Sequence, residues 1–177
     1  MTRTYWDEPS SLGICIDWFG PYKTYEKFMT DIRKEDEGTK IIYYAECREG
    51  WAQYIGLSTN SKIRFNNQKT MKNLGITGGT VYWYGILNSQ GKSGRRTKPG
   101  NKRPSAPLDL DQAETALINW LSPEKNDRKT DCRPKQSVSI TNRFFSTKKA
   151  KPKVGPENLP QILFYDWILD RYTCHYR

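Results

Sequence analysis

The chain has 177 residues, which is enough for one domain with a hydrophobic core and too few for two ordinary domains. Hydrophobic residues make up 36% of the sequence and aromatic residues 13%, a composition that suits a folded protein. Lys and Arg number 29 against 19 Asp and Glu, so the formal net charge is +10. We therefore expect a polyanionic partner.

Two further features restrict the class of protein. The N-terminus lacks a basic-then-apolar leader, and no apolar run approaches the about 18 residues that span a bilayer, so we expect a soluble, cytoplasmic protein with no membrane partner. The four cysteines are scattered without a C-x-x-C pair, and the single histidine is His175. This pattern argues against a zinc site and for reduced structural thiols.

Residues 1–39 form the first segment, which we interpret as an N-terminal extension. Residues 12–19 read as a strand and residues 25–32 as a short helix. Four acidic residues lie near the end of this segment, and we expect that end to face away from nucleic acid.

The stretch from 41 to 74 predicts a hairpin followed by a helix. Two runs rich in Ile, Tyr and Trp flank Arg48-Glu49-Gly50, a short connection containing Gly, which is typical of antiparallel strands joined by a hairpin turn. Tyr43 and Tyr54 would then lie on adjacent strands. Capping residues at 58–60 and apolar residues at helical spacing predict a helix that ends at Gly75.

Beyond this helix the pattern predicts a buried strand over residues 80–87 and then a basic loop over 88–107. Gly and Pro prevent a long helix in the loop, and it contains no acidic residue. The loop is expected to follow a phosphate backbone, and the alternative is a solvated surface loop. The residues expected to contact DNA are Lys92, Arg95, Arg96, Lys98, Lys102 and Arg103.

A second helix is predicted from residue 109, where Asp109 and Gln112 have the spacing of a capping box. Glu114 falls on the apolar stripe of this helix, between Leu110 and Leu117. A carboxylate on a buried face is costly unless it is paired or binds a cation. Glu114 is therefore either a residue at the edge of the stripe, paired with a neighbouring cation, or a metal ligand.

The last segment, residues 128–177, is interpreted as a basic C-terminal extension. Residues 137–144 read as a strand, and Asn158-Leu159-Pro160 is predicted to open a helix. The apolar face of that helix would either cover the sheet of its own chain or meet a second copy. It comprises Ile162, Tyr165, Ile168, Leu169 and Tyr172.

Several of these residues together resemble the GIY-YIG nuclease family. Ile41-Ile42-Tyr43 stands where the family has its first tripeptide, ten residues separate Tyr43 from Tyr54, and Tyr54-Ile55-Gly56 is the second tripeptide. Arg64 follows Gly56 by eight residues, as the family's helical arginine does. Glu114, followed by Pro123 and Asn126, is similar to the family's later metal-binding helix. Two positions depart from the family: Ile41 replaces the first glycine, and Gln68 stands where many members carry a histidine.

The resemblance implies an α+β fold, with an antiparallel or mixed three-stranded central sheet flanked by helices. Residues 40–127 would be the nuclease core, with the basic loop as an insertion. Glu114 would hold Mg²⁺, for which Mn²⁺ could substitute, and Arg64 would bind the phosphate oxygens. Tyr43 and Tyr54 would bracket the attacking water, and Gln68 and Asn126 complete the expected catalytic set.

Three functions are compatible with this sequence. The first is a metal-dependent DNA endonuclease of restriction, homing or mobile-element type that acts on double-stranded DNA, with a second copy of the chain as a further expected partner. The second is an RNA-cleaving enzyme or toxin, because the phosphate chemistry does not specify the sugar. The third is a nucleic-acid-binding module without catalysis.

Overall fold

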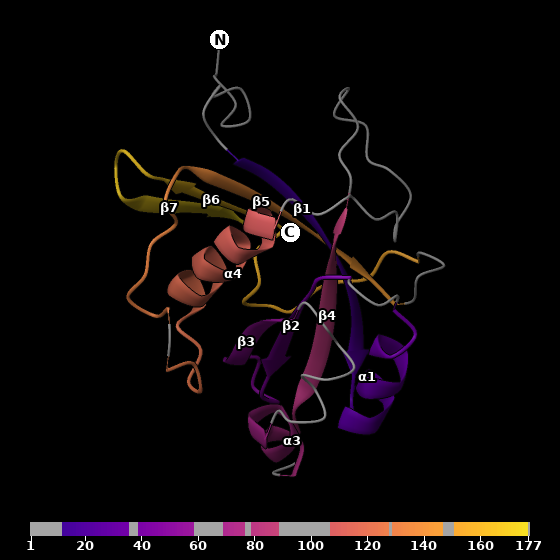
Figure 1. Cartoon of the computed structure of the whole chain (residues 1–177). Helices are drawn as coiled ribbons and strands as arrows, with labels where there is room; N and C mark the ends of the chain where they lie inside the picture. The colour runs from indigo at the N-terminus through magenta and orange to yellow at the C-terminus, as the bar shows by residue number, and fades with distance from the viewer. Residues whose placement is uncertain are drawn as a thin grey trace.

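The computed structural model describes residues 12–35, 39–58, 69–76, 79–88, 107–127, 129–146 and 151–176. Seven strands form one curled sheet in the order β3-β2-β4-β1-β5-β6-β7 (Figure 1). The strands are β1 (Leu12–Tyr22), β2 (Ile41–Glu46), β3 (Ala52–Ser58), β4 (Val81–Asn88), β5 (Val138–Phe145), β6 (Ile162–Asp166) and β7 (Arg171–His175). The helices are α1 (Tyr25–Ile32), α3 (Lys69–Ile76) and α4 (Pro107–Leu121).

The prediction of a small three-stranded sheet flanked by helices is wrong. Strands β3, β2 and β4 do lie together, but they form only part of the seven-stranded sheet. β1 pairs antiparallel with β4 and parallel with β5, so the sheet is mixed and continues through β6 to β7. The physical reason is that the segments on both sides of the expected core contain apolar strands, which pair with it and bury their side chains in the same sheet.

Most of the individual elements agree with the sequence patterns. The strand predicted at 12–19 is β1, the helix predicted at 25–32 is α1, and the strands predicted at 80–87 and 137–144 are β4 and β5. The side chain of Thr24 caps α1 by accepting a hydrogen bond from the backbone N–H of Lys27 at 3.3 Å. The β2–β3 hairpin is also confirmed. Its turn is possible because Gly50 adopts φ +86°, a conformation that glycine accepts without strain.

The helix predicted after Pro160 is not present, because that segment forms the β6–β7 hairpin. β6 pairs with β5, with Leu163 opposite Ile140, and the three central residues of β6, Leu163 to Tyr165, are buried. The turn that follows is held by Asp166, whose Oδ1 accepts hydrogen bonds from the backbone N–H groups of Ile168 and Leu169, both at 3.0 Å. The apolar spacing resembles that of a helix, but the local hydrogen bonds of Asp166 favour a turn.

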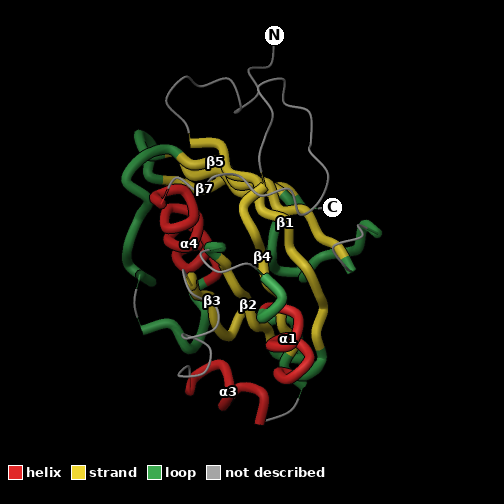
Figure 2. Tube along the Cα trace, turned by 45° about the vertical axis from the view of Figure 1, so that its right-hand side comes forward, coloured by secondary structure: helices red, strands yellow, loops and turns green. Residues whose placement is uncertain are grey.

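The two faces of the sheet are covered by different helices. α4 packs on one face against Ile42, Tyr44 and Trp83, whereas α1 and α3 pack on the other face against Tyr43 and Tyr82. Figures 1 and 2 show α4 and α1 on either side of β4. No helix in the described part of the chain is long and apolar enough to cross a membrane.

A buried ion pair ties three central strands together on the α1 face. Asp17 of β1 accepts hydrogen bonds from Arg143 of β5 at 2.6 and 2.8 Å and from Asn88 of β4 at 2.5 Å. All three side chains are buried. Because a charge is buried at little cost only when it is paired, this cluster helps to fix the register of β4, β1 and β5.

Candidate active site

The two tyrosines of the expected site lie together on neighbouring strands. Tyr43 is on β2 and Tyr54 on β3, and their rings are stacked with centroids 6.0 Å apart and an interplanar angle of 23°. Tyr43 lies opposite Gly56, and Ala45 lies opposite Tyr54. Tyr43 is fully buried, whereas Tyr54 is only partly buried. Of the two tyrosines, Tyr54 is therefore the more exposed to solvent.

Gly56 leaves the space in which the Tyr43 ring lies. A Cβ atom at position 56 would overlap the hydroxyl end of this ring and would stand 2.6 Å from its Cε2 atom. No side chain fits there unless Tyr43 moves. The glycine of the Tyr54-Ile55-Gly56 tripeptide is therefore required by the close approach of the phenol, at an ordinary backbone conformation.

Asn126 lies in the loop after α4 and is hydrogen-bonded to β3, the strand that carries Tyr54. Its Nδ2 donates to the carbonyl of Ile55 at 2.8 Å, and its Oδ1 accepts from the N–H of Ile55 at 2.9 Å. Just before it, the N–H groups of Glu124 and Lys125 donate to the carbonyls of Ala52 and Gln53 at 3.3 and 2.9 Å. This segment covers the outer edge of β3, so Asn126 acts as a positioning residue for β3.

Glu114 is buried and paired with a cation. Its Oε2 lies 2.6 Å from Nζ of Lys129, and Oδ1 of Asp111 lies 2.7 Å from the same nitrogen. Burial lowers the pKa of Lys129, but the hydrogen bonds and charges of Asp111 and Glu114 outweigh that effect and raise it. The structure thus shows the paired glutamate that the sequence left open as one alternative.

Lys129 and Asp111 were not identified from the sequence. Asp111 lies three residues before Glu114 and so shares its side of the helix. This spacing could have predicted that the two carboxylates lie close together. Lys129 is in the loop after α4, and no local pattern indicates that its side chain returns to the helix.

The carboxylate pair has the chemistry of a cation site. Two carboxylate oxygens, one from Asp111 and one from Glu114, converge on a single positive atom, and Mg²⁺ commonly binds proteins through one or two carboxylates. The donor set therefore fits a divalent ion in competition with the ammonium group of Lys129. Among the described residues, no group of three or more His, Cys, Asp or Glu side chains could hold a metal ion.

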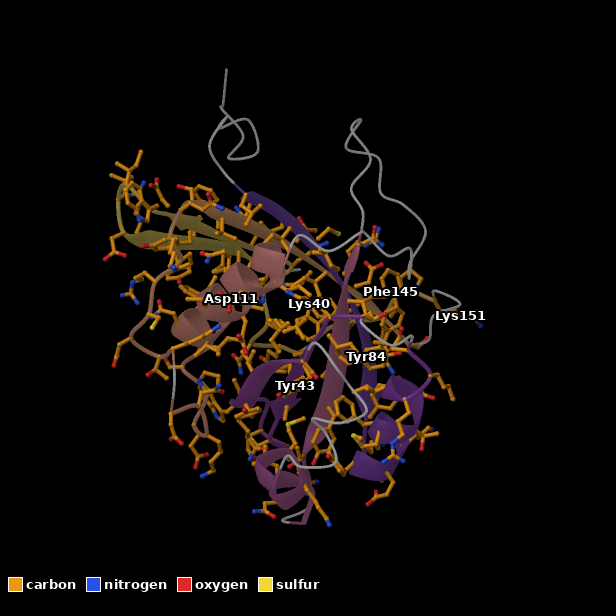
Figure 3. All side chains as sticks on the ribbon, viewed as in Figure 1. Lys40, Tyr43, Tyr84, Asp111, Phe145 and Lys151 are labelled. Carbon is orange, nitrogen blue, oxygen red and sulfur yellow. The ribbon has the colours of Figure 1, made fainter. Side chains whose placement is uncertain are left out.

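The structure does not bring Glu114 and the tyrosine pair to one face of the sheet. The apolar residues of α4 pack on the face that also carries Ile42 and Tyr44, opposite the face on which Tyr43 lies. Figure 3 labels Asp111 on α4, Tyr43 on β2 and Tyr84 on β4. The two parts of the candidate site are linked around the β3 edge by the loop that contains Asn126 and Lys129.

The remaining predicted site residues lie outside the described residues. These are Arg64, Gln68, Lys92, Arg95, Arg96, Lys98, Lys102 and Arg103. Comparison with known proteins adds no residues to the site. No family model, no curated protein and no solved structure matches this chain.

Proposed function

We propose that the protein is a cytoplasmic, metal-dependent nuclease of the GIY-YIG type that hydrolyses phosphodiester bonds in double-stranded DNA. The observation that carries the proposal is the stacked pair of Tyr43 and Tyr54 on adjacent strands, together with Gly56 beneath the Tyr43 ring. The net charge of +10 supports a polyanionic substrate.

The two tyrosines have different roles in this proposal. Tyr54 is partly exposed, so its phenol can lose its proton to solvent, and the phenolate can then take a proton from the attacking water. Tyr43 is fully buried and stacked against Tyr54, so it holds the Tyr54 ring in place. Gly56 permits this packing, and Asn126 fixes the backbone of Ile55 between Tyr54 and Gly56.

The charge of the phosphate group is met by other residues. Asp111 and Glu114 would hold the divalent ion, which when bound supplies Lewis-acid stabilisation of the developing negative charge. Because α4 lies across the sheet from Tyr43, the phosphate would have to reach both this ion and Tyr54 around the β3 edge. Arg64, with a planar guanidinium that stays protonated, would bind the nonbridging oxygens. The basic residues between positions 88 and 107 would hold the DNA backbone without reading its bases.

A second candidate is a nucleic-acid-binding module that does not cleave. The observation that favours it is the ion pair of Glu114 with Lys129, because a carboxylate neutralised by an ammonium is less available to a metal ion. The position of α4 on the face opposite Tyr43 also favours it. Cleavage of RNA at the same site is a third candidate, since the proposed residues contact phosphate rather than sugar.

One experiment separates these candidates. Supercoiled plasmid, linear duplex DNA and total RNA are each incubated with the full chain in Mg²⁺ and in EDTA. We expect cleavage of the two DNA substrates that depends on Mg²⁺. RNA cleavage alone would support the ribonuclease, and retention of DNA on a filter without cleavage in Mg²⁺ or Mn²⁺ would support the binding module.

Variants assign the activity to the proposed residues. Glu114→Gln should lower the cleavage rate by at least about 100-fold, the scale on which a lost charge-stabilising group acts. Glu124→Gln is the matched control, because the Glu124 side chain is exposed and, among the described residues, pairs with Lys125. A Glu114→Gln protein that cleaves at the wild-type rate would contradict the assignment of Glu114, provided its thermal unfolding is unchanged.

A further inference from the structure

The two edge strands of the sheet differ in whether another segment of the chain covers their outer side. β3 forms one edge, and the segment at 124–126 covers it with four hydrogen bonds to the β3 backbone. β7 forms the other edge, and within the described residues its outer side receives no backbone hydrogen bond from a loop. An uncovered edge strand presents N–H and C=O groups that can pair with another strand.

β7 also lacks several of the features that prevent edge pairing, although it is short and carries the charge of Arg171 at its first position. The strand reads Arg171-Tyr172-Thr173-Cys174-His175, with no proline and no lysine. Its register with β6 is continuous from Asp166↔Arg171 to Ile162↔His175, so no bulge twists the edge away.

Exposed apolar side chains gather at the two ends of this strand. Six large hydrophobic residues of the described chain are exposed, and four of them adjoin β7. Trp167, Ile168 and Leu169 precede it, with 57, 78 and 55% of their surface exposed, and Tyr176 follows it with 50%. The three consecutive exposed residues of the turn form an apolar patch of the kind that marks a binding surface.

The turn that carries these apolar residues is held in shape by polar contacts. Asp166 accepts from the N–H groups of Ile168 and Leu169, and the N–H of Trp167 donates to Oγ of Ser137 at 3.1 Å. Asp170 accepts from the hydroxyl of Tyr165 at 2.8 Å and pairs with Arg133 at 3.1 Å. The apolar side chains are thus presented by an ordered turn that does not depend on their own burial.

We infer that β7 is the pairing edge of a symmetric dimer, in which two copies of this chain join their sheets antiparallel about a two-fold axis through Thr173. In that register Thr173 lies opposite Thr173 of the second copy, and Tyr172 lies opposite Cys174 of the second copy. The start of one β7 lies beside the end of the other, so Trp167, Ile168 and Leu169 of each copy meet Tyr176 of the other. All four exposed apolar side chains become covered.

A second copy fits this surface better than a nucleic acid or a membrane. Asp166 and Asp170 flank the apolar turn and offset the charges of Arg133 and Arg171, so the surface has no excess positive charge for phosphate groups. The isologous arrangement also uses the same patch on both copies, as two-fold symmetry requires. The inference is independent of nuclease activity.

Sedimentation of the full chain tests the dimer. Over about 1 to about 100 µM protein, a range that detects micromolar affinity, we expect a species of twice the 20.7 kDa chain mass. Thr173→Lys should raise the dimer dissociation constant at least about tenfold, because it places like charges opposite each other at the axis. Thr173→Val should preserve the dimer, as should Thr30→Lys, which makes the same substitution on the exposed side of α1.

Cross-linking tests the register directly. Residues opposite each other on antiparallel strands have Cα atoms about 4.5–5.5 Å apart, within the range that a disulfide spans. Thr173→Cys should therefore form a covalent dimer under mild oxidation, well above the level of wild-type chain or of Thr30→Cys. A chain of 20.7 kDa at every concentration, or a dimer unaffected by Thr173→Lys, would overturn the inference.

Discussion

Tyr43 and Gly56 face each other across the β2–β3 pair, and the ring of Tyr43 occupies the space where any other residue at position 56 would place its Cβ. This relationship explains in steric terms why a tyrosine in one tripeptide is accompanied by a glycine in the other. It predicts that the two positions are energetically coupled.

A double-mutant cycle measures that coupling. Gly56→Ala should destabilise the fold by about 1–3 kcal/mol, the usual cost of overpacking, because the Tyr43 ring must move. In a Tyr43→Ala background the same substitution should cost far less, since the overlapping ring is gone. Urea unfolding of the four proteins gives the coupling energy. If Gly56→Ala lowered the unfolding free energy equally in both backgrounds, the Tyr43 ring would not be what excludes a side chain at position 56.

The buried pair of Asp17 and Arg143 should be a major determinant of stability. Asp17→Ala leaves the buried guanidinium of Arg143 without its carboxylate, and we expect a loss of about 3–5 kcal/mol in unfolding free energy. The contrasting variant is Lys34→Ala, which removes an exposed pair with Asp31 and should change stability by less than about 1 kcal/mol. Similar losses in the two variants would contradict the structural account of this cluster.

Glu46 should make the stability fall as the pH rises. Burial raises the pKa of its carboxyl from 4.5 to about 7, against the lowering effect of hydrogen bonds from Trp83 and Tyr44. Between pH 4.5 and about 7 the folded protein therefore binds more protons than the unfolded chain at this site. The free energy of unfolding therefore keeps the contribution of Glu46 at the acidic end of this range. Toward neutral pH it falls by about 2–3 kcal/mol.

The variant Glu46→Gln tests this dependence, because an amide cannot ionise and yet retains an acceptor oxygen for the indole N–H of Trp83. We expect Glu46→Gln to be more stable than the wild-type protein at about pH 8 and close to it at about pH 5. The measurement is urea unfolding at both values. A difference between the two proteins that does not vary with pH would exclude Glu46 as the titrating group.

Asn126 should control the opening of the β3 strand. Asn126→Ala removes both hydrogen bonds to Ile55, and we expect the amide of Ile55 to exchange at least about tenfold faster with deuterium. Asn158→Ala is the control, because Asn158 donates one hydrogen bond to Gly50 outside β3. Unchanged exchange at Ile55 in Asn126→Ala would show that the Asn126 side chain does not control the opening of β3.

The sequence predicted the local elements better than their assembly. The hairpin that places Tyr43 beside Tyr54 was predictable, because its turn and its strand composition are local signals. The parallel pairing of β1 with β5 was not, since it joins segments more than a hundred residues apart. The end of the chain was misread because Ile162, Tyr165 and Leu169 recur at helical spacing, whereas the hydrogen bonds of Asp166 define a turn.

The candidate site was predictable only in part for the same reason. The spacing within residues 43–56 located the tyrosine pair and its glycine, which the structure brings together. The partners of Glu114 depend on the path of the loop after α4, which returns Lys129 to the helix. No sequence pattern predicts the path of that loop. The position of Lys129 beside Glu114 therefore could be found only from the structure.

The rate of DNA cleavage by Tyr54→Phe, measured in a single turnover at saturating protein, tests the central claim most directly. This substitution removes only the hydroxyl group that we propose as the proton acceptor, and it leaves the ring to stack on Tyr43. The control is Tyr25→Phe, a similarly exposed tyrosine on α1. We predict a loss of at least about 100-fold for Tyr54→Phe and wild-type rates for Tyr25→Phe. Wild-type cleavage by Tyr54→Phe would contradict the account, because the proton would then be taken by another group.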